Sequence, residues 1–321
     1  MSENNLRPFD IQHDLAPVAD LVETCFADTL DPDGKRYIAR MRSSARNRNF
    51  LRWAALNVEI PNIPFSGYVW EQDGTIVGNA SLIPYRIDGH PSYLIANVAV
   101  HPDYRQRGIA RLLTQKSMEH AKQRGAPEIW LHVREENERA VALYHSLDFQ
   151  ERARRTTWIA EPGIGPGPGD PDVKIGTPSP DQWLQLRSWI ESNFPPEVTW
   201  HLPLYKNALR PGIYGTLFRF INKVHLRQWT ASLGKVLFGG LFWQATSSYA
   251  DALWLAAPVD ADNQSIRSLL IAAQKSLKSV RTLRLEYPAG QSAAGIQSGG
   301  FSPQQTLIWM SYGLAGSESS I

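Results

Sequence analysis

Residues 97–110 constrain the fold of this chain more than any other stretch. The run Asn97-Val98-Ala99-Val100 is typical of a buried strand, and the His101-Pro102 pair ends it. Gly108 follows, and after it apolar residues recur at helical spacing as far as Gly125. The sequence therefore predicts a strand, a basic turn and a helix in direct succession.

The turn between this strand and helix has the chemistry of an anion site. The first amides of a helix have no partner within the helix and lie at the positive end of its dipole. Gly108 and Ala110 leave these amides accessible, and Arg105, Arg107 and Arg111 add positive charge. Both Gly-x-Gly-x-x-Gly and Gly-Lys-Ser/Thr are missing, so the spacing alone leaves open whether the turn binds a phosphate or only shapes the chain.

A second strand and helix follow directly. Residues 128–134 alternate between apolar and polar side chains, which predicts a strand. Asn137 is of the type that caps a helix N-terminus, and Ala140, Leu143 and Tyr144 then fall on one helical face. We therefore expect a second short helix that ends near Phe149.

These two segments together resemble the GNAT superfamily of acetyl-CoA-dependent N-acetyltransferases. Residues 105–110 look like its motif A, and Asn137-x-x-Ala140-x-x-Leu143-Tyr144-x-x-x-Asp148-Phe149 looks like its motif B. The likeness spans about residues 6–159. Asp148 departs from the pattern, because the family commonly has glycine before the aromatic residue, and this puts the exit of the second helix in question.

The resemblance implies roles for particular residues. The strand at 97–100 would splay from the strand at 128–134, and the pantetheine arm of acetyl-CoA would add to it like a strand. Asn137 would bind pantetheine or a water beside it, and Tyr144 would also line the site and protonate the departing thiolate. The remaining cofactor-binding residues expected are Val98, Ala99, Val100, Arg105, Gln106, Arg107, Gly108, Ile109, Ala110 and Arg111.

The general base is not evident from the sequence. Asn97 cannot titrate, although it holds the strand position where a relative could carry glutamate. His132, Glu135 and Glu71 stay open as candidates, and His101 is expected only to shape the turn. Cys25 lies on the apolar stripe of a first helix, so we expect an inert core thiol and not a nucleophile.

Residues 35–52 carry seven Lys and Arg side chains. We interpret this segment as a helix with a solvated basic face, and the alternative is a collar for an anionic acceptor or a cofactor phosphate. Further along, the Asp73-Gly74 pair between two strand-like runs predicts a tight β-hairpin.

Composition limits the class of protein. The chain has 321 residues, of which 43% are apolar, so it is long enough for two globular cores. A formal charge of +2 gives no overall field for nucleic acid or an anionic membrane, so any polyanion site must be local. A single cysteine and an N-terminus without a basic, then apolar, leader favour a cytoplasmic protein without metal, nucleic-acid or membrane partners.

The second half reads as a weak repeat of the first. A Gly- and Pro-rich linker at 162–180 separates an acetyl-CoA-binding domain, 1–161, from a degenerate GNAT-like domain, 181–321. The fold class predicted is therefore α+β, with tandem, mostly antiparallel mixed sheets flanked by helices. Residues 260–265 replace the basic glycine turn with two aspartates, so we expect no acetyl-CoA there.

The functional prediction is acetyl transfer from acetyl-CoA to a primary amine, on a small molecule, by direct attack in a ternary complex. Two alternatives stay open, namely transfer of a longer acyl group and a non-catalytic acyl-CoA sensor. A nucleic-acid binder resting on residues 35–52 is a third, weaker interpretation. We expect a monomer or a homodimer.

Overall fold

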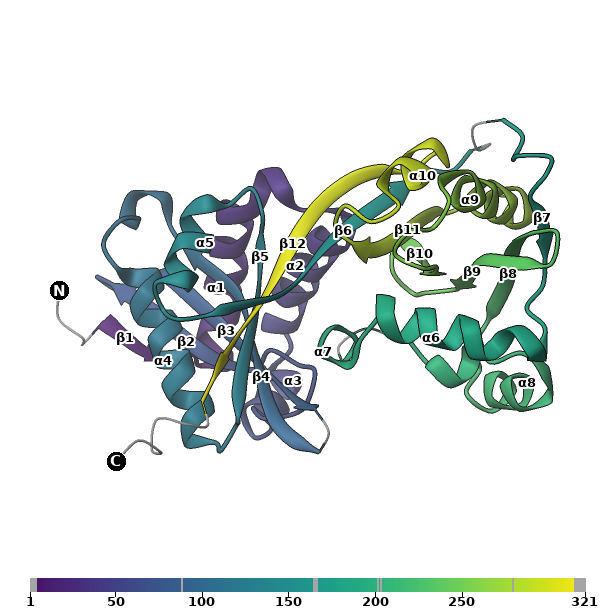
Figure 1. Cartoon of the computed structure of the whole chain (residues 1–321). Helices are drawn as coiled ribbons and strands as arrows, with labels where there is room; N and C mark the ends of the chain where they lie inside the picture. Colours follow the sequence, from purple (N-terminus) through teal and green to yellow (C-terminus); the bar gives the residue numbers. More distant parts are fainter. Residues whose placement is uncertain are drawn as a thin grey trace, which may run out of the picture. The chain divides into compact units, whose positions relative to one another are not determined.

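The computed structural model describes residues 5–87, 89–163, 167–200, 202, 204–278 and 280–314. The chain divides into two compact units, shown in Figure 1. Unit 1 comprises residues 1–133, 137–152 and 309–321, and unit 2 comprises 134–136 and 153–308. These units differ from the contiguous ranges 1–161 and 181–321, because two long strands, β6 (Gln150–Ala160) and β12 (Ser302–Gly313), pass from one unit into the other.

Unit 1 contains a mixed sheet in which neighbouring strands follow the chain in the order β1-β2-β3-β4-β5. The first three pairings are antiparallel, and β4 runs parallel to β5. Asp73 and Gly74 have φ values of 50° and 76°, which confirms the predicted tight turn between β2 and β3. The strands are β1 (Leu6–Pro8), β2 (Ser66–Gln72), β3 (Thr75–Ile87), β4 (His90–Val100) and β5 (Glu128–Arg134).

Helices cover both faces of this sheet. Val69 and Ala99 pack in one core with residues of α1, whereas the neighbouring Tyr68 of β2 reaches His120 of α4. Successive strand residues point to opposite faces, so α1 and α4 lie on opposite sides. The helices of unit 1 are α1 (Ile11–Phe26), α2 (Pro32–Ala45), α3 (Arg48–Ala55), α4 (Ile109–Gln123) and α5 (Glu138–His145), with 3₁₀ turns η2 (Ala27–Thr29) and η3 (Pro102–Tyr104).

The single helix predicted for residues 35–52 is wrong, because the segment forms two helices. The first ends at Ala45, and Asn47 starts the second by accepting a hydrogen bond from the Phe50 amide at 3.0 Å. A side chain that caps a helix N-terminus competes with continuation of the preceding helix. Asn47 therefore interrupts the basic face that the composition suggested was continuous.

Unit 2 repeats the arrangement of unit 1. Its strands lie in the order β6-β11-β10-β9-β8-β7, and β10 pairs with β11 in parallel while α9 connects them. This matches the parallel β4–β5 pair connected by α4, so the repeat predicted from the sequence is confirmed. The further strands are β7 (Lys174–Gly176), β8 (Leu226–Leu233), β9 (Val236–Gln244), β10 (Ala250–Ala256) and β11 (Thr282–Pro288).

The core of unit 2 lies on both faces of its sheet. Ile266, Leu269 and Leu270 of α9 pack on Leu253 and its neighbours. On the other face, Leu186 and Ile190 of α6 pack on Trp254 and Phe242. The helices are α6 (Trp183–Asn193), α7 (Pro196–Thr199), α8 (Gly212–Ile221), α9 (Asn263–Leu277) and α10 (Ala293–Ser298), with 3₁₀ turns η4 (Pro180–Gln182) and η5 (Lys206–Leu209).

The predicted linker, 162–180, is partly a structured segment. Residues 174–176 form β7, which pairs with residues 230–232 of β8, and Val173 is buried in the core of unit 2. The Asp170 amide also donates to the Ser268 hydroxyl at 2.9 Å. Residues 164–166 of the predicted linker lie outside the described residues.

Candidate active site

Strands β4 and β5 separate at the end nearest the basic turn. Their parallel pairing covers Tyr93 to Ile95 on β4 and Ile129 to Leu131 on β5. β4 continues as a strand to Val100 and β5 to Arg134 beyond this pairing. The resemblance to the GNAT superfamily implied that these strands splay here, and the wedge between them can take an added extended group by backbone pairing.

A bulge in β4 begins where the two strands part. The register with β3 shifts between Asn79 and Ser81, and Asn97 has a left-handed φ of 51°. Asn tolerates this conformation better than most residues. The Asn79 side-chain amide donates to the Asn97 carbonyl at 2.9 Å, and the Asn97 side-chain amide donates to the Tyr37 hydroxyl at 3.3 Å. These bonds hold the bulge and connect it to α2.

The basic turn leads into α4 through two left-handed residues. Gln106 has a φ of 62° and Gly108 a φ of 74°, and Gly108 is the N-cap of α4. No side chain caps this helix N-terminus. A Cβ on Gly108 would meet no atom within 4 Å, so the positive φ and not a lack of space favours glycine here. The space in front of the turn is open. The turn can therefore present backbone N–H donors to an anion.

Gly78 of β3 fixes the start of α4 against the sheet. A Cβ at Gly78 would lie 2.8 Å from Ile109 and 3.1 Å from Leu113, both of which are buried on α4. The missing side chain allows the helix to approach closely. The N-terminus of α4 is thereby held beside the separated end of β4.

Each of the three arginines in the turn and at the start of α4 contacts the protein itself. Arg105 Nε donates to the Val100 carbonyl at 3.1 Å, and Arg107 donates to the Asp103 carbonyl at 3.0 Å. Arg111 Nη2 donates to the Ser146 hydroxyl at 2.6 Å, which joins α4 to the end of α5. Arg105 and Arg107 are exposed, so they can still add positive potential beside the turn, whereas Arg111 has a structural contact that the sequence did not suggest.

Helix α5 places the second predicted motif. Asn137 caps it by accepting from the Ala140 amide at 3.2 Å, as the sequence predicted. Tyr144 is 5% exposed, its ring lies 5.9 Å from that of Phe149, and burial raises the pKa of its phenol. A buried phenol stays protonated at neutral pH, which a general acid requires.

Asp148 ends α5 in the conformation that glycine usually supplies. Its φ is 62°, its amide donates to the His145 carbonyl, and the Phe149 amide donates to the Tyr144 carbonyl at 3.1 Å. These are the two hydrogen bonds of a Schellman motif. The departure from the family pattern therefore leaves the helix exit unchanged, at the cost of a strained aspartate.

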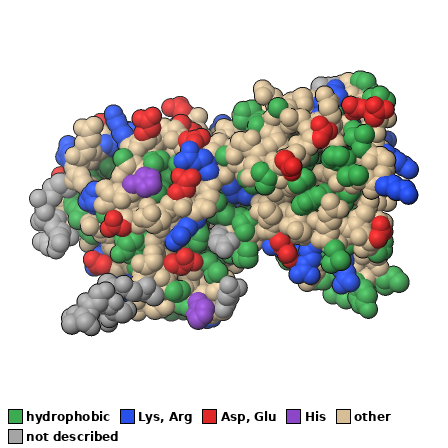
Figure 2. All heavy atoms as spheres, in the orientation of Figure 1, with side chains coloured by type: hydrophobic (Ala, Val, Ile, Leu, Met, Phe, Trp, Pro, Cys, Tyr) green, Lys and Arg blue, Asp and Glu red, His purple; other side chains and the backbone are tan. Residues whose placement is uncertain are grey.

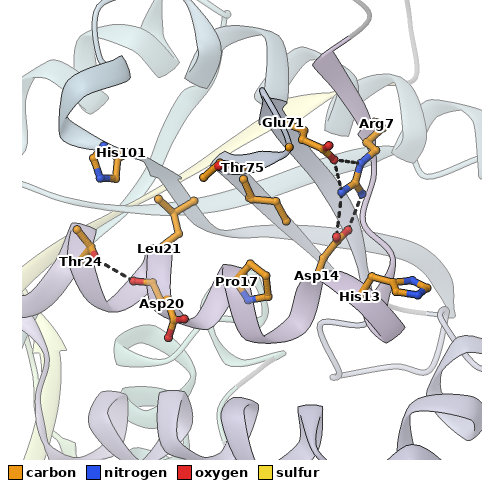
Figure 3. Close-up of a pocket in the computed structure, with 12 residues that line it drawn as sticks. Arg7, His13, Asp14, Pro17, Asp20, Leu21, Thr24, Glu71, Thr75 and His101 are labelled. Atoms are coloured by element: carbon orange, nitrogen blue, oxygen red, sulfur yellow. Dashed lines mark hydrogen bonds and ion pairs between the residues drawn. The ribbon is translucent and has the colours of Figure 1, made fainter.

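Two of the three candidate bases are engaged in ion pairs. Figure 3 shows Glu71 beside Arg7, whose guanidinium contacts both Glu71 and Asp14 at 2.6 Å, in a cavity of about 450 Å³ that His101 also lines. Glu135 is paired with Arg154. Each of these carboxylates already accepts a hydrogen bond from an arginine side chain, so neither is free to bind an incoming ammonium. His132 stacks on Trp309 with ring centroids 4.1 Å apart, and it remains a candidate base.

Cys25 is partly buried at the margin of the site. It packs against the core on α1, its thiol donates to the Val100 carbonyl at 3.3 Å, and burial raises its pKa. A protonated, partly buried thiol is a poor nucleophile, which is consistent with the predicted inert role. His101 Nδ1 accepts from the Asp103 amide at 3.4 Å and so shapes the turn, as expected.

Tyr37 is the residue near the site whose importance the sequence did not reveal. It lies within the basic segment, where its spacing indicated only a core position. The separation of sixty residues between Tyr37 and Asn97 carries no local signal. Only the fold brings the phenol of α2 to the bulge of β4.

A second polar cluster lies at the other end of α4. Glu59 accepts from the Tyr93 hydroxyl at 2.8 Å and lies 3.2 Å from His120 Nε2. His120 is eleven residues after Ile109, or about 16 Å along the helix from the basic turn. This cluster is therefore too distant to serve the separated end of β4 and acts as a packing network.

The equivalent turn in unit 2 is closed by its own side chains. The Asp262 carboxylate accepts from the Ser265 amide at 2.8 Å at the N-terminus of α9, and Asn263 accepts from the Gly295 amide. The N-terminal amide that a phosphate would use is already bonded to a carboxylate. This is consistent with the prediction that only the first turn serves a cofactor.

Two classes of site receive no support from the described residues. In the ranges that the structure describes, no group of three or more His, Cys, Asp and Glu side chains could hold a metal ion. In the same ranges, no helix is both long and apolar enough to cross a membrane.

The chain contains a domain of a known family. Residues 34–149 match the family described as Acetyltransferase (GNAT) family. These residues include the separated strands, the basic turn and α5. This segment of the chain is therefore similar to the GNAT family of acetyltransferases.

Curated relatives match a shorter segment. The chain is 40% identical over 62 residues to the [Ribosomal protein bS18]-alanine N-acetyltransferase of Escherichia coli (strain K12), which is 19% of this chain and 42% of that protein. It is 43% identical over 63 residues to the Mycothiol acetyltransferase of Thermobifida fusca (strain YX), covering 20% of each. The chain thus spans less than half the length of these relatives.

Solved structures extend the likeness to the whole chain at the level of the fold. A tandem GNAT protein from the clavulanic acid biosynthesis pathway aligns with 98% of this chain and 99% of its own, with a TM-score of 0.50 and 16% identity. A GCN5-related N-acetyltransferase from Sphaerobacter thermophilus aligns with 97% and 96%, with a TM-score of 0.57 and 14% identity. Such low identity shows a shared fold and no more.

Proposed function

We propose that this protein transfers an acetyl group from acetyl-CoA to a primary amine on a small molecule. The observation that carries the proposal is the juxtaposition of three features in unit 1. The β4–β5 pairing ends at Ile95 and Leu131, and an uncapped helix N-terminus follows the turn at 105–108. The hydrogen bond from Arg111 to Ser146 holds the end of α5, which carries Tyr144, against α4. The relatives named above include acetyltransferases, which supports the same reaction class.

Acetyl-CoA fits these residues chemically. The wedge beyond Ile95 offers the backbone of Val98 to Val100 to the amides of pantetheine. The amides of residues 106–110 can hold the pyrophosphate, with Arg105 and Arg107 supplying charge. The side chain of Asn137 uses its oxygen to cap α5, so its NH₂ group is the part that can bind the pantetheine arm.

The protein's own contribution to the reaction is orientation and proton transfer. An amine held beside the bulge at Asn97 would attack the thioester carbonyl directly, without a covalent enzyme intermediate. The phenol of Tyr144 would then give its proton to the departing thiolate. Water or His132 would take the proton that the ammonium must lose before attack.

Calorimetric titration and thiol release test this proposal. We expect acetyl-CoA to bind the full chain and an amine panel to yield free thiol, with Tyr144→Phe slowing release about 100-fold at unchanged acetyl-CoA affinity. Undiminished turnover of Tyr144→Phe would contradict the role of Tyr144 as general acid. Failure of acetyl-CoA to bind would contradict the proposed site as a whole.

One observation favours keeping the alternatives in the test. Asn97 cannot act as a base, so binding without turnover across the amine panel would favour an acyl-CoA sensor. A panel of thioesters distinguishes acetyl from longer acyl transfer.

We also propose that the protein is cytoplasmic, works as a monomer or homodimer, does not bind nucleic acid, and binds one acetyl-CoA per chain.

A further inference from the structure

Unit 1 contains a small, largely apolar cavity on the α1 side of the sheet. Its volume is about 220 Å³, which is below the roughly 300–1,000 Å³ typical of pockets for drug-sized ligands. Helices α1, α2 and α3, the segment before β2, and β3 form its walls. The residues that matter here are Val18, Tyr37, Arg40, Phe50, Phe65 and Ser81.

The cavity reaches the separated end of β4 by two routes. Tyr37 lines it, and the Tyr37 hydroxyl accepts the hydrogen bond from Asn97. Ser81 also lines it and pairs in register with Ala96, the residue before the bulge. A molecule in this cavity would therefore lie against the part of β4 where the thioester is expected.

The charge of the cavity restricts what it can hold. Its lining includes Arg40 and no aspartate or glutamate. Elsewhere on α2, Arg36 pairs with Asp33, and Arg42 pairs with Asp20 and Glu23. Within the described part of the chain Arg40 forms no ion pair, and its side chain is exposed at the cavity. An anion would complement it, and a polycation would find no partner.

We propose that the acceptor is a compact primary amine with an apolar body and one carboxylate, and this rests on the proposed acetyl transfer. The carboxylate binds Arg40, the apolar body packs on Val18, Phe50 and Phe65, and the amine points toward Tyr37 and Asn97. Transfer forms an N–C bond to the acetyl carbonyl and breaks its C–S bond. The ammonium nitrogen loses two protons when it becomes the amide. Tyr144 protonates the thiolate and regains a proton from water, so one proton in all is released to solvent.

Matched acceptors test the substrate class. Phenylalanine and leucine are compared with phenethylamine and 3-methylbutylamine, which lack the carboxylate, and with spermidine, by thiol release at saturating acetyl-CoA. A charge-assisted hydrogen bond to a carboxylate contributes about 1.5–3 kcal/mol, so the carboxylate should raise kcat/KM about 10- to 100-fold. Arg40→Gln should remove most of this preference, and Arg46→Gln, outside the cavity, should keep it.

The outcomes separate this inference from the proposed function. Absence of acetyl-CoA binding counts against the proposed function itself. If acetyl-CoA binds but spermidine or the amines without a carboxylate react with a kcat/KM equal to or above that of the amino acids, the acceptor class alone is overturned. The acceptor class is also overturned if Arg40→Gln keeps the full preference for acceptors with a carboxylate. Binding of acetyl-CoA with no transfer to phenylalanine or leucine overturns it as well.

A separate observation in unit 2 carries a second inference. Helix α8 buries only Gly215, and five large apolar side chains of this helix are exposed. Figure 2 shows hydrophobic side chains gathered at the lower right, where Figure 1 places α8. Their exposed fractions are 85% for Ile213, 73% for Tyr214, 54% for Leu217, 82% for Phe220 and 67% for Ile221. Soluble surfaces rarely expose so continuous an apolar helix face.

The sequence around α8 carries only positive charge, which favours an anionic partner. Residues 198–250 contain six Lys and Arg and no Asp or Glu, although the whole chain has 33 basic and 31 acidic residues. Arg210 and Lys223 stand at the two ends of the helix, and Arg210 lies over the Tyr214 ring at 5.0 Å. An apolar face with cations at its rim is typical of helices that lie in the headgroup region of an anionic bilayer.

We infer that α8 binds the surface of an anionic lipid membrane with its apolar face in the headgroup region. Sedimentation with phosphatidylcholine vesicles, with and without 30% phosphatidylglycerol, tests this. The full chain should bind the anionic vesicles at least tenfold more tightly, and the pair Phe220→Ser and Ile221→Ser should abolish binding. Leu184→Ser, an equally exposed change on α6, is the control and should bind like the parent.

Either of two results overturns this membrane inference. One is equal or absent sedimentation with both vesicle types. The other is a dimer in light scattering that the Phe220→Ser and Ile221→Ser pair dissociates, because the face would then join two copies of the chain.

Discussion

The side-chain amide of Asn97 donates a hydrogen bond to the Tyr37 hydroxyl across 3.3 Å, and this bond joins the bulge of β4 to helix α2. Asn97 has a left-handed backbone, and its carbonyl is held from the other side by Asn79. The position where β4 leaves β5 is thus fixed by side chains from two other elements. The acceptor and the thioester are expected to meet at this position.

Removal of the Tyr37 hydroxyl should affect the acceptor and not the cosubstrate. We expect Tyr37→Phe to lower kcat/KM for the amine about fivefold, because a net hydrogen bond contributes about 1 kcal/mol and its loss frees the bulge. The acetyl-CoA Kd should stay unchanged. Tyr68→Phe removes a comparable bond, to His120 at 3.2 Å at the far end of α4, and should leave both values alone. A matching loss in both variants would contradict a positioning role for Tyr37.

The left-handed turn before α4 should be needed for acetyl-CoA binding. Gly108→Ala places a Cβ at a φ of 74°, which costs about 1–2 kcal/mol, and binding should weaken about 5- to 30-fold. Gly125→Ala is the matched control, because Gly125 has a φ of 72° just after the same helix. Both variants should lose similar stability in urea denaturation, and only Gly108→Ala should lose affinity. Equal affinities would mean that the turn does not bind the pyrophosphate.

Asp148 offers a stabilising substitution. Its φ of 62° suits glycine, so Asp148→Gly should raise the free energy of unfolding by about 0.5–1 kcal/mol. Asp148→Ala should lower it, because alanine has neither the conformational freedom of glycine nor the local hydrogen bonding of aspartate. Thermal unfolding measures both. A lower melting temperature for the glycine variant would show that the aspartate side chain does more than end α5.

The buried ion pair of unit 2 should be costly to break. Arg155 is 3% exposed, contacts Glu286 at 2.8 Å and donates to the Asn193 carbonyl at 2.9 Å. Arg155→Ala leaves these acceptors unpaired and should cost about 3–5 kcal/mol. Arg187→Ala breaks an exposed pair with Glu191 and should cost about 0.5 kcal/mol or less. Similar midpoints for both variants in urea would contradict this ranking.

Burial of Tyr144 should make stability depend on alkaline pH. Burial raises its pKa above the ordinary value near 10, so the unfolded chain releases this proton first as the pH rises. The contribution of the neutral phenol to stability is complete below pH 10 and is lost as the pH rises further, toward the pKa of the folded state. The free energy of unfolding should therefore fall more steeply above pH 10 in the parent than in Tyr144→Phe. Parallel curves would mean that the phenol is solvated in the folded state.

The local elements were largely predictable from the sequence. The Asp73-Gly74 hairpin, the strand at 128–134 and the Asn137 cap all depend on short-range signals, namely turn residues, alternation and capping chemistry. Asp148 shows why such signals work even when the residue differs. The backbone hydrogen bonds at the end of α5 demand a left-handed residue there, and aspartate can comply.

Other features needed the tertiary structure. The contact between Tyr37 and Asn97, the engagement of Arg111 with Ser146, and the ion pair of Glu71 with Arg7 join distant parts of the chain and have no local signature. The break at Asn47 was missed because its flanks continue the helical spacing of apolar residues. The passage of β6 and β12 between units also depends on strand pairing over more than a hundred residues, which periodicity does not encode.

Isothermal titration of the full chain with acetyl-CoA tests the central claim most directly. We expect one molecule bound per chain, at the turn before α4, with affinity weakened in Gly108→Ala and kept in Gly125→Ala. We expect no second binding event, because the Asp262 carboxylate occupies the N-terminus of α9. Absence of binding, or binding of two molecules per chain, would contradict it.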